Sequence, residues 1–130
     1  MKRILVVAAV VLVISASSKG VAMGYEKATF AGGCFWCVEA TFEKVKGVKA
    51  VVSGYTGGEK STSTYNEVSS GMTQHIEAVQ VIYDSDEVTY EDLVEAFWQM
   101  YDPTDAGGSF YDRGHQYTSA IFVANDEERA

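Results

Sequence analysis

Short apolar segments alternate with segments of helical periodicity along the chain. Residues 27–31, 48–55, 76–83 and 119–124 have the length and the bounding turn residues of β-strands. Apolar residues at helical spacing lie between the first two strands and again between the last two: Phe35, Val38, Phe42 and Val45, then Leu93, Val94, Phe97 and Tyr101 behind a capping arrangement at Thr89 and Asp92. The order β-α-β, then β-α-β, predicts an α+β fold of the ferredoxin-like, split βαβ type with long loops.

The N-terminus has a pattern of its own. A short positive region, Met1 to Arg3, precedes an unbroken apolar run at residues 4–14, and small residues follow it. This layout predicts a secretory signal peptide over residues 1–22, which leaves residues 23–130 as one domain. An uncleaved membrane anchor is the alternative, although the apolar run is shorter than the roughly 20 residues of a membrane span. Both interpretations place the domain outside the cytoplasm, in the periplasm or the extracellular space.

The charge balance excludes some classes of partner. The chain of 130 residues has a net charge of −8, and Lys2, Arg3 and Lys19 all lie in the N-terminal region, so the rest of the chain is still more acidic. Nucleic acid binding depends on neutralising phosphates, and anionic membrane surfaces attract basic proteins. We therefore expect neither partner.

The only two cysteines, Cys34 and Cys37, form a C-x-x-C motif. A disulfide across so short a loop stabilises a fold little, which favours a redox or a metal role. A four-ligand zinc site would need His75 and His115 as well, so redox chemistry is the preferred interpretation. Cys34 follows two glycines and begins the first predicted helix, where free N–H groups and the helix dipole favour a thiolate. The glycines are expected to let the backbone turn and let a substrate approach.

Three more residues invite a chemical interpretation. Glu77 shares one face of its strand with Val79, Val81 and Tyr83, so it is either a buried acid able to donate a proton or an exposed residue at a solvated strand end. The pattern alone does not decide between these two. Phe35 fits the apolar stripe of the first helix, whereas Trp36 falls off that stripe and would make a wall beside the thiol.

Several spaced motifs together resemble a known family. In chain order these are GCFW at residues 33–36, SGYTGG at 53–58, TYNEV at 64–68, GMTQHIEAV at 71–79, FW at 97–98, DPT at 102–104 and DRGHQYTSAIF at 112–122. Over residues 27 to about 123 the sequence is similar to the A-type peptide methionine sulfoxide reductases. This family reduces the S epimer of methionine sulfoxide, free or within oxidised proteins.

The resemblance implies a role for each candidate site residue: Cys34 as the nucleophile, Glu77 as the acid that protonates the sulfoxide oxygen, Tyr65 and Tyr117 as hydrogen-bond donors to that oxygen, Phe35 and Trp36 as the pocket for the S-methyl group, and Asp112 as a contact for the substrate's main-chain nitrogen. It implies no bound cofactor and no metal. The enzyme would be regenerated by an external, thioredoxin-like dithiol.

The sequence departs from the family pattern in three places. Cys37 stands where many members have Gly, as in a smaller C-x-x-C subgroup, and is then a candidate resolving thiol. Residues 105–110 replace a more polar stretch. The chain stops at Ala130, where family members usually continue, so we expect a domain that lacks the usual C-terminal part.

Two other functions fit some of these features. A thioredoxin-like disulfide oxidoreductase also has a C-x-x-C at a helix start, but it needs neither Glu77 nor the tyrosine pair. An inactive, truncated module that only binds a partner is the second alternative.

Overall fold

The computed structural model describes residues 24–130, so the predicted signal peptide lies outside the described residues. The main elements occur in the predicted order: β1 (Tyr25–Gly32), α1 (Phe35–Phe42), β2 (Val48–Thr56), β3 (Ile76–Asp84), α3 (Tyr90–Trp98) and β6 (Ser119–Phe122). The predicted capping box at the start of α3 is present, because Thr89 and Asp92 each accept a hydrogen bond from the other's backbone N–H.

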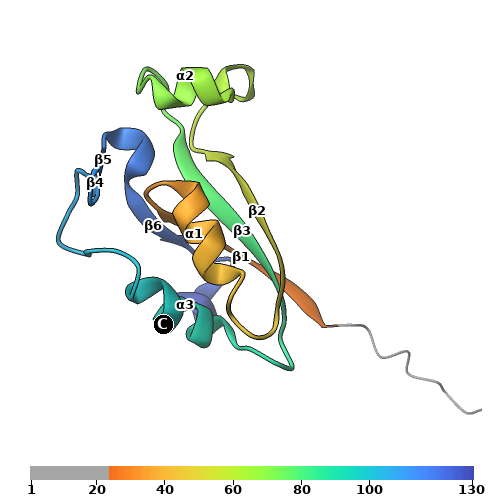
Figure 1. The fold of residues 1–130 in the computed structure, drawn as a ribbon. Coiled ribbons are helices and arrows are strands. Elements are labelled where there is room, and N and C mark those ends of the chain that lie inside the picture. Colours follow the sequence, from red (N-terminus) through yellow and green to blue (C-terminus); the bar gives the residue numbers. More distant parts are fainter. Residues whose placement is uncertain (1–23) are drawn as a thin grey trace, which may run out of the picture.

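The strands form one four-stranded sheet in the order β2-β3-β1-β6, and all neighbouring strands are antiparallel. Each β-α-β unit therefore connects two strands across a third strand that lies between them, as the split βαβ pattern requires. Helix α1 lies in front of the sheet in Figure 1, and α3 lies below it. The predicted α+β fold is confirmed.

The core lies between the sheet and these two helices. Phe30 of β1 is fully buried and packs against Phe42 of α1 and Phe97 of α3, with ring centroids 4.9 and 5.2 Å apart. On β3, the odd-numbered residues from Glu77 to Tyr83 are all buried, whereas Gln80 on the opposite face is exposed. The period of two along a strand thus carries Glu77 to the same side as the core residues.

Six short elements were not predicted: η1 (Lys60–Thr62), α2 (Tyr65–Ser69), β4 (Gly108–Ser109), β5 (Asp112–Arg113), η2 (His115–Tyr117) and α4 (Asp126–Arg129). Each is too short for hydrophobic periodicity to reveal it. Helix α2 has a local signal nonetheless, because the Thr64 side chain accepts a hydrogen bond from the Glu67 N–H and donates one to the Glu67 carboxylate. This cap fixes the helix that begins with Tyr65.

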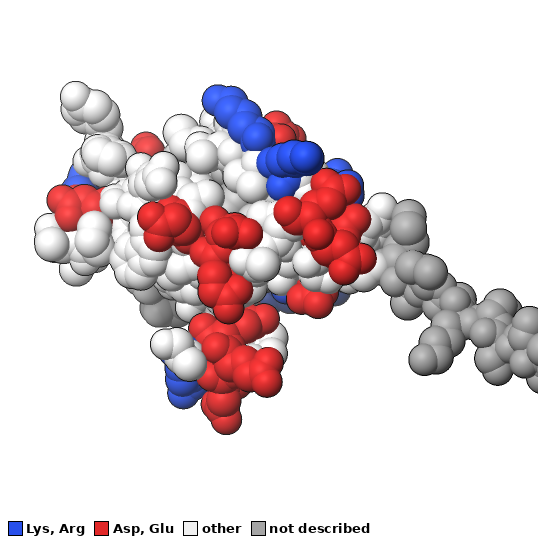
Figure 2. All heavy atoms as spheres, turned by 90° about the horizontal axis from the view of Figure 1, so that it is seen from below, with Lys and Arg blue, Asp and Glu red and all other residues white. Residues whose placement is uncertain are grey.

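Acidic side chains crowd the underside of the molecule. Figure 2 shows dense groups of Asp and Glu on this face, with Lys and Arg gathered mainly along one edge. Acidic residues in the first turns of α3 and α4 agree with this distribution. None of the helices within residues 24–130 is long and apolar enough to cross a membrane.

Candidate active site

The turn before α1 is shaped by contacts of its two glycines with the protein itself. Gly33 has a φ of 91°, and a Cβ at this position would overlap the Ser109 side chain. A Cβ at Gly32 would lie 2.8 Å from the Phe97 ring. That a substrate approaches beside these glycines stays a prediction. Gly32 packs against Phe97 of α3, and Gly33 packs against the loop that carries Ser109. They bring this loop close to Cys34.

Cys34 is the residue immediately before α1, and its carbonyl accepts the N–H groups of Cys37 at 3.1 Å and Val38 at 3.3 Å. The Cys34 thiol is half-buried and the Cys37 thiol is exposed, and neither forms a disulfide. Desolvation by the surrounding side chains raises the pKa of Cys37, and the nearby Cys34 sulfur and Asp112 raise it further. The two sulfurs are thus close neighbours on the first turn of α1.

Glu77 is buried, with only 2% of its surface exposed. Its carboxylate accepts the backbone N–H of Phe35, the residue after Cys34, at 3.0 Å. Burial raises the pKa of Glu77, the Phe35 hydrogen bond opposes this rise, and the charge of Asp112 adds to it. Of the two interpretations that the sequence left open, the structure supports a buried acid. The raised pKa favours a carboxyl that keeps its proton to a higher pH than an exposed glutamate does.

Two aromatic residues follow Cys34 and have different environments. Phe35 is buried in the core, 5.9 Å from the Trp36 ring. Trp36 is 62% exposed and stacks on Tyr65 of α2, with ring centroids 5.8 Å apart and planes 17° from parallel. The exposed pair forms an aromatic wall on one side of the thiol, which suits a small apolar group.

Tyr117 is close enough to several other predicted site residues to be affected by their charges. Burial raises the pKa of Tyr117, and the nearby charges of Glu77, Asp112, Tyr65 and Cys34 add to this rise. Tyr117 therefore lies in the neighbourhood of these four predicted site residues.

Tyr55 is a site residue that the sequence reasoning missed. It pairs with Glu77 across β2 and β3, and its ring lies 5.5 Å from that of Phe35. Burial raises the pKa of Tyr55. The charge of Glu77 raises it further, and Tyr65 and Tyr117 make smaller contributions in the same direction. The period of two along β2 could have placed Tyr55 on the core face, but its pairing with Glu77 depends on the register of two strands.

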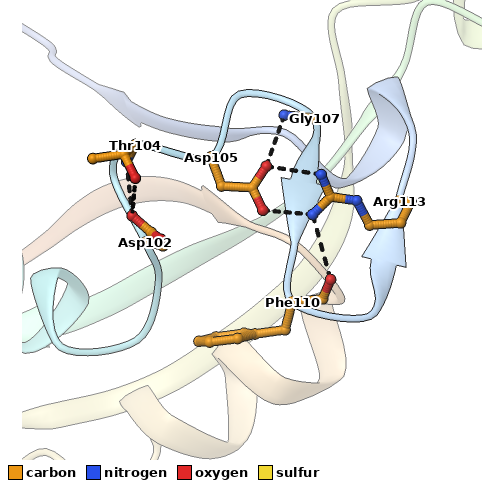
Figure 3. A network of polar contacts seen from close by, with 6 residues as sticks. All are labelled: Asp102, Thr104, Asp105, Gly107, Phe110 and Arg113. Atoms are coloured by element: carbon orange, nitrogen blue, oxygen red, sulfur yellow. Dashed lines mark hydrogen bonds and ion pairs between the residues drawn. The ribbon is translucent and has the colours of Figure 1, made fainter.

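The loop from Asp102 to Arg113 brings Asp112 to the site. Figure 3 shows how the loop closes on itself: the Arg113 guanidinium donates hydrogen bonds to both oxygens of Asp105 and one to the Phe110 carbonyl, at 3.3 Å. The Gly107 N–H donates to Asp105 at 3.1 Å. The hydrogen bonds with Arg113 lower the pKa of Asp105. Asp112 precedes Arg113 directly and lines the same groove as Cys34 and Cys37.

Among residues 24–130, no three His, Cys, Asp or Glu side chains are grouped so that they could hold a metal ion. The two histidines are held elsewhere: the His75 ring bonds to the Glu59 carbonyl at 2.8 Å, and the His115 ring to the Gln74 carbonyl at 3.0 Å.

Comparison with known proteins agrees with this geometry. The sequence model of the family described as "Peptide methionine sulfoxide reductase" matches residues 26–130. The chain is 51% identical to the peptide methionine sulfoxide reductase MsrA of Limosilactobacillus reuteri, over 82% of this chain and 61% of that protein. It is 56% identical to the MsrA of Bacillus velezensis, over 80% of this chain and 59% of that protein.

Solved structures show the same likeness. Methionine sulfoxide reductase A of Corynebacterium diphtheriae superposes with a TM-score of 0.75 at 34% identity, over 82% of this chain and 53% of that one. Mxr1 of Saccharomyces cerevisiae in its reduced form gives 0.74 at 30% identity, over 81% of this chain and 62% of that one.

The chain belongs to the peptide methionine sulfoxide reductase family. It spans about three fifths of the length of the two MsrA relatives, 61% and 59%.

The Glu77→Gln variant tests the raised pKa of Glu77. Gln keeps an oxygen that can accept the Phe35 N–H but cannot ionise. The pKa of this carboxyl is higher in the folded chain than in the unfolded chain, where it is about 4.3. Its contribution to the free energy of unfolding is therefore fully present below the pKa of the unfolded chain. This contribution is lost as pH rises through the pKa of the folded chain. We expect the free energy of unfolding of the wild type, relative to the variant, to fall as pH rises above the pKa of the unfolded chain.

Urea unfolding at a series of pH values measures this difference. Glu95→Gln, which removes an exposed carboxylate from α3, is the matched control. The free energy of unfolding of the wild type, relative to Glu77→Gln, could instead stay constant or increase as pH rises. Either result would contradict a buried Glu77 with a raised pKa.

Proposed function

We propose that this chain reduces methionine S-sulfoxide to methionine, with Cys34 as the nucleophile. The observation that carries the proposal is the buried Glu77 carboxyl, hydrogen-bonded at 3.0 Å to the N–H of the residue that follows Cys34. A sulfoxide oxygen is a poor leaving group until it is protonated, and a thiol nucleophile beside a neutral acid meets both requirements. Family membership supports the same reaction.

The first half of the reaction uses the residues around Cys34. The Cys34 thiolate attacks the sulfoxide sulfur while Glu77 gives its proton to the oxygen. The hydroxyls of Tyr65 and Tyr117 donate hydrogen bonds to that oxygen as negative charge develops on it. The S–O bond of the substrate and the new sulfur–sulfur bond then break as the hydroxyl passes to the Cys34 sulfur. Methionine leaves, and Cys34 remains as a sulfenic acid.

Binding relies on the apolar wall and on one acid. The rings of Phe35 and Trp36 hold the S-methyl group, with Trp36 fixed by its stack on Tyr65. Asp112 accepts a hydrogen bond from the main-chain nitrogen of the substrate. This set of contacts suits free methionine sulfoxide as well as the residue within an oxidised protein, which implies a role in protein repair.

The second half of the reaction restores the thiol. Cys37 condenses with the sulfenic acid, water leaves, and a Cys34–Cys37 disulfide forms. A thioredoxin-like dithiol outside the cytoplasm then reduces this disulfide, and no bound cofactor takes part. Export rests on the pattern of residues 1–22 alone.

The first test is turnover of S-methionine sulfoxide with dithiothreitol by the chain. We expect methionine to form, no methionine with Cys34→Ser, and a loss of about 10²–10⁴-fold in kcat with Glu77→Gln, the usual contribution of a general acid. Glu95→Gln serves as the control for loss of a carboxylate. A wild-type chain that reduces insulin disulfides but makes no methionine would instead be a disulfide oxidoreductase, and one that does neither would be a binding module.

The second test concerns Cys37. The Cys37→Ser variant should release about one methionine per enzyme and then stop when thioredoxin is the reductant, because its sulfenic acid has no internal thiol to condense with. Cys34→Ser is the control that should release none. Thioredoxin-driven cycling of Cys37→Ser at the wild-type rate would show that another thiol resolves the sulfenic acid.

A further inference from the structure

A groove of about 740 Å³ runs between α1, α3 and the loop before β5. Its walls are largely apolar and include Val45, Ala96 and Met100. Phe110 and Tyr111 stand at its rim and are 68% and 100% exposed. Exposed aromatic residues beside an apolar groove are typical of a surface that another molecule covers.

The groove is distinct from the proposed sulfoxide pocket. Both cysteines line it, but Glu77, Trp36, Tyr65 and Tyr117 do not. Only Cys34 and Asp112 are shared with the set of residues that would hold the sulfoxide. The groove therefore leads to the two sulfurs by a second route.

The cysteines and the groove follow one line along α1. Cys34, Cys37 and Thr41 are three and four residues apart, so their side chains lie one above another on the same side of the helix. Thr41 and Val45 continue the groove beyond Cys37. Cys37 thus lies between Cys34 and the part of the groove that Thr41 and Val45 line.

The positions of Cys34, Cys37 and Thr41 along α1 determine which sulfur of a Cys34–Cys37 disulfide a thiolate can reach from the groove. A thiolate attacks a disulfide sulfur from the side opposite to the sulfur that leaves. For attack on Cys37 with Cys34 leaving, that side is the groove. The exposure of Cys37, against the half-burial of Cys34, favours the same sulfur.

We propose that the groove is the docking surface for the reducing protein dithiol, whose thiolate attacks Cys37. This inference rests on the proposed reductase function and adds to it the place of docking and the sulfur that is attacked. The partner is a protein that carries its nucleophilic thiol on an apolar surface without acidic residues. Among residues 24–130, Asp112 is the only charged residue that lines the groove, and the whole chain has a net charge of −8. An acidic contact surface would therefore be repelled.

The exchange takes place in two steps. The partner's thiolate bonds to the Cys37 sulfur, the Cys34–Cys37 bond breaks, and Cys34 leaves as a thiolate. The partner's second thiol, deprotonated, then attacks the mixed disulfide and releases Cys37 as a thiolate, which takes up a proton. Two electrons pass from the partner's dithiol, which ends as a disulfide. Desolvation raises the pKa of Cys37, which supports this direction because it makes Cys37 the poorer leaving group if Cys34 were attacked.

An Ala96→Glu variant tests the docking site. It places a charge in the groove on a helix that tolerates Glu well. We expect kcat/KM for reduced thioredoxin to fall about tenfold or more, because an unpaired charge would be buried at the interface. Turnover of free methionine sulfoxide with dithiothreitol should be unchanged. Ala40→Glu on the exposed side of α1, outside the groove, is the matched control.

The outcomes separate this proposal from the reductase function. No methionine with dithiothreitol in the wild type would overturn the function itself. Normal dithiothreitol turnover with unchanged thioredoxin kinetics in Ala96→Glu would overturn the docking site alone. A loss confined to sulfoxide-containing peptides, with dithiothreitol as reductant, would assign the groove to the substrate and overturn the proposal as well.

Trapping identifies the sulfur that is attacked. Oxidised wild-type chain is mixed with a thioredoxin whose second cysteine is replaced by serine, so that the mixed disulfide accumulates. Fragment masses of the crosslinked peptide should place the bond on Cys37. A bond on Cys34 would contradict the proposed direction of attack.

Discussion

The hydrogen bond from the Phe35 N–H to Glu77 is the contact on which the site depends. It joins the first residue of α1 to the second residue of β3, so it fixes the acid relative to the cysteine that precedes Phe35. Burying a carboxyl without a charged partner costs free energy unless the group keeps its proton or is hydrogen-bonded. Glu77 is buried at the place where the proposed reaction needs a proton donor. Groups that are unfavourable for stability are typical of functional sites.

The rest of the architecture supports this contact. The core formed by Phe30, Phe42 and Phe97 holds α1 and α3 against the same face of the sheet. Gly33 packs closely against Ser109, so the loop over residues 102–113, which carries Asp112, lies close to the cysteines. The Trp36–Tyr65 stack belongs to the proposed sulfoxide pocket, whereas the apolar groove is lined by both cysteines and by neither of these aromatic residues.

Local patterns allowed the main strands and helices to be predicted, because a period of two or of 3.6 residues needs no tertiary information. The same pattern placed Glu77 on the apolar face but could not show whether that end of β3 is covered. The cover comes from α1, which is distant in sequence. Tyr55 was missed for a similar reason, since its partnership with Glu77 depends on strand register. The contacts of Gly32 and Gly33 with Phe97 and Ser109 depend on loop packing that no local pattern specifies.

The most direct test of the account is the protonation state of Glu77 in the reduced chain. Carbon-13 NMR of the glutamate side-chain carboxyls follows each one as pH rises, and the Glu77→Gln variant assigns the signal. Glutamate has a pKa of about 4.3 in model peptides. We expect the Glu77 carboxyl to remain protonated at pH values at which the exposed glutamates have already ionised. A Glu77 carboxyl that ionises with them or before them would contradict a buried acid that donates its proton beside Cys34.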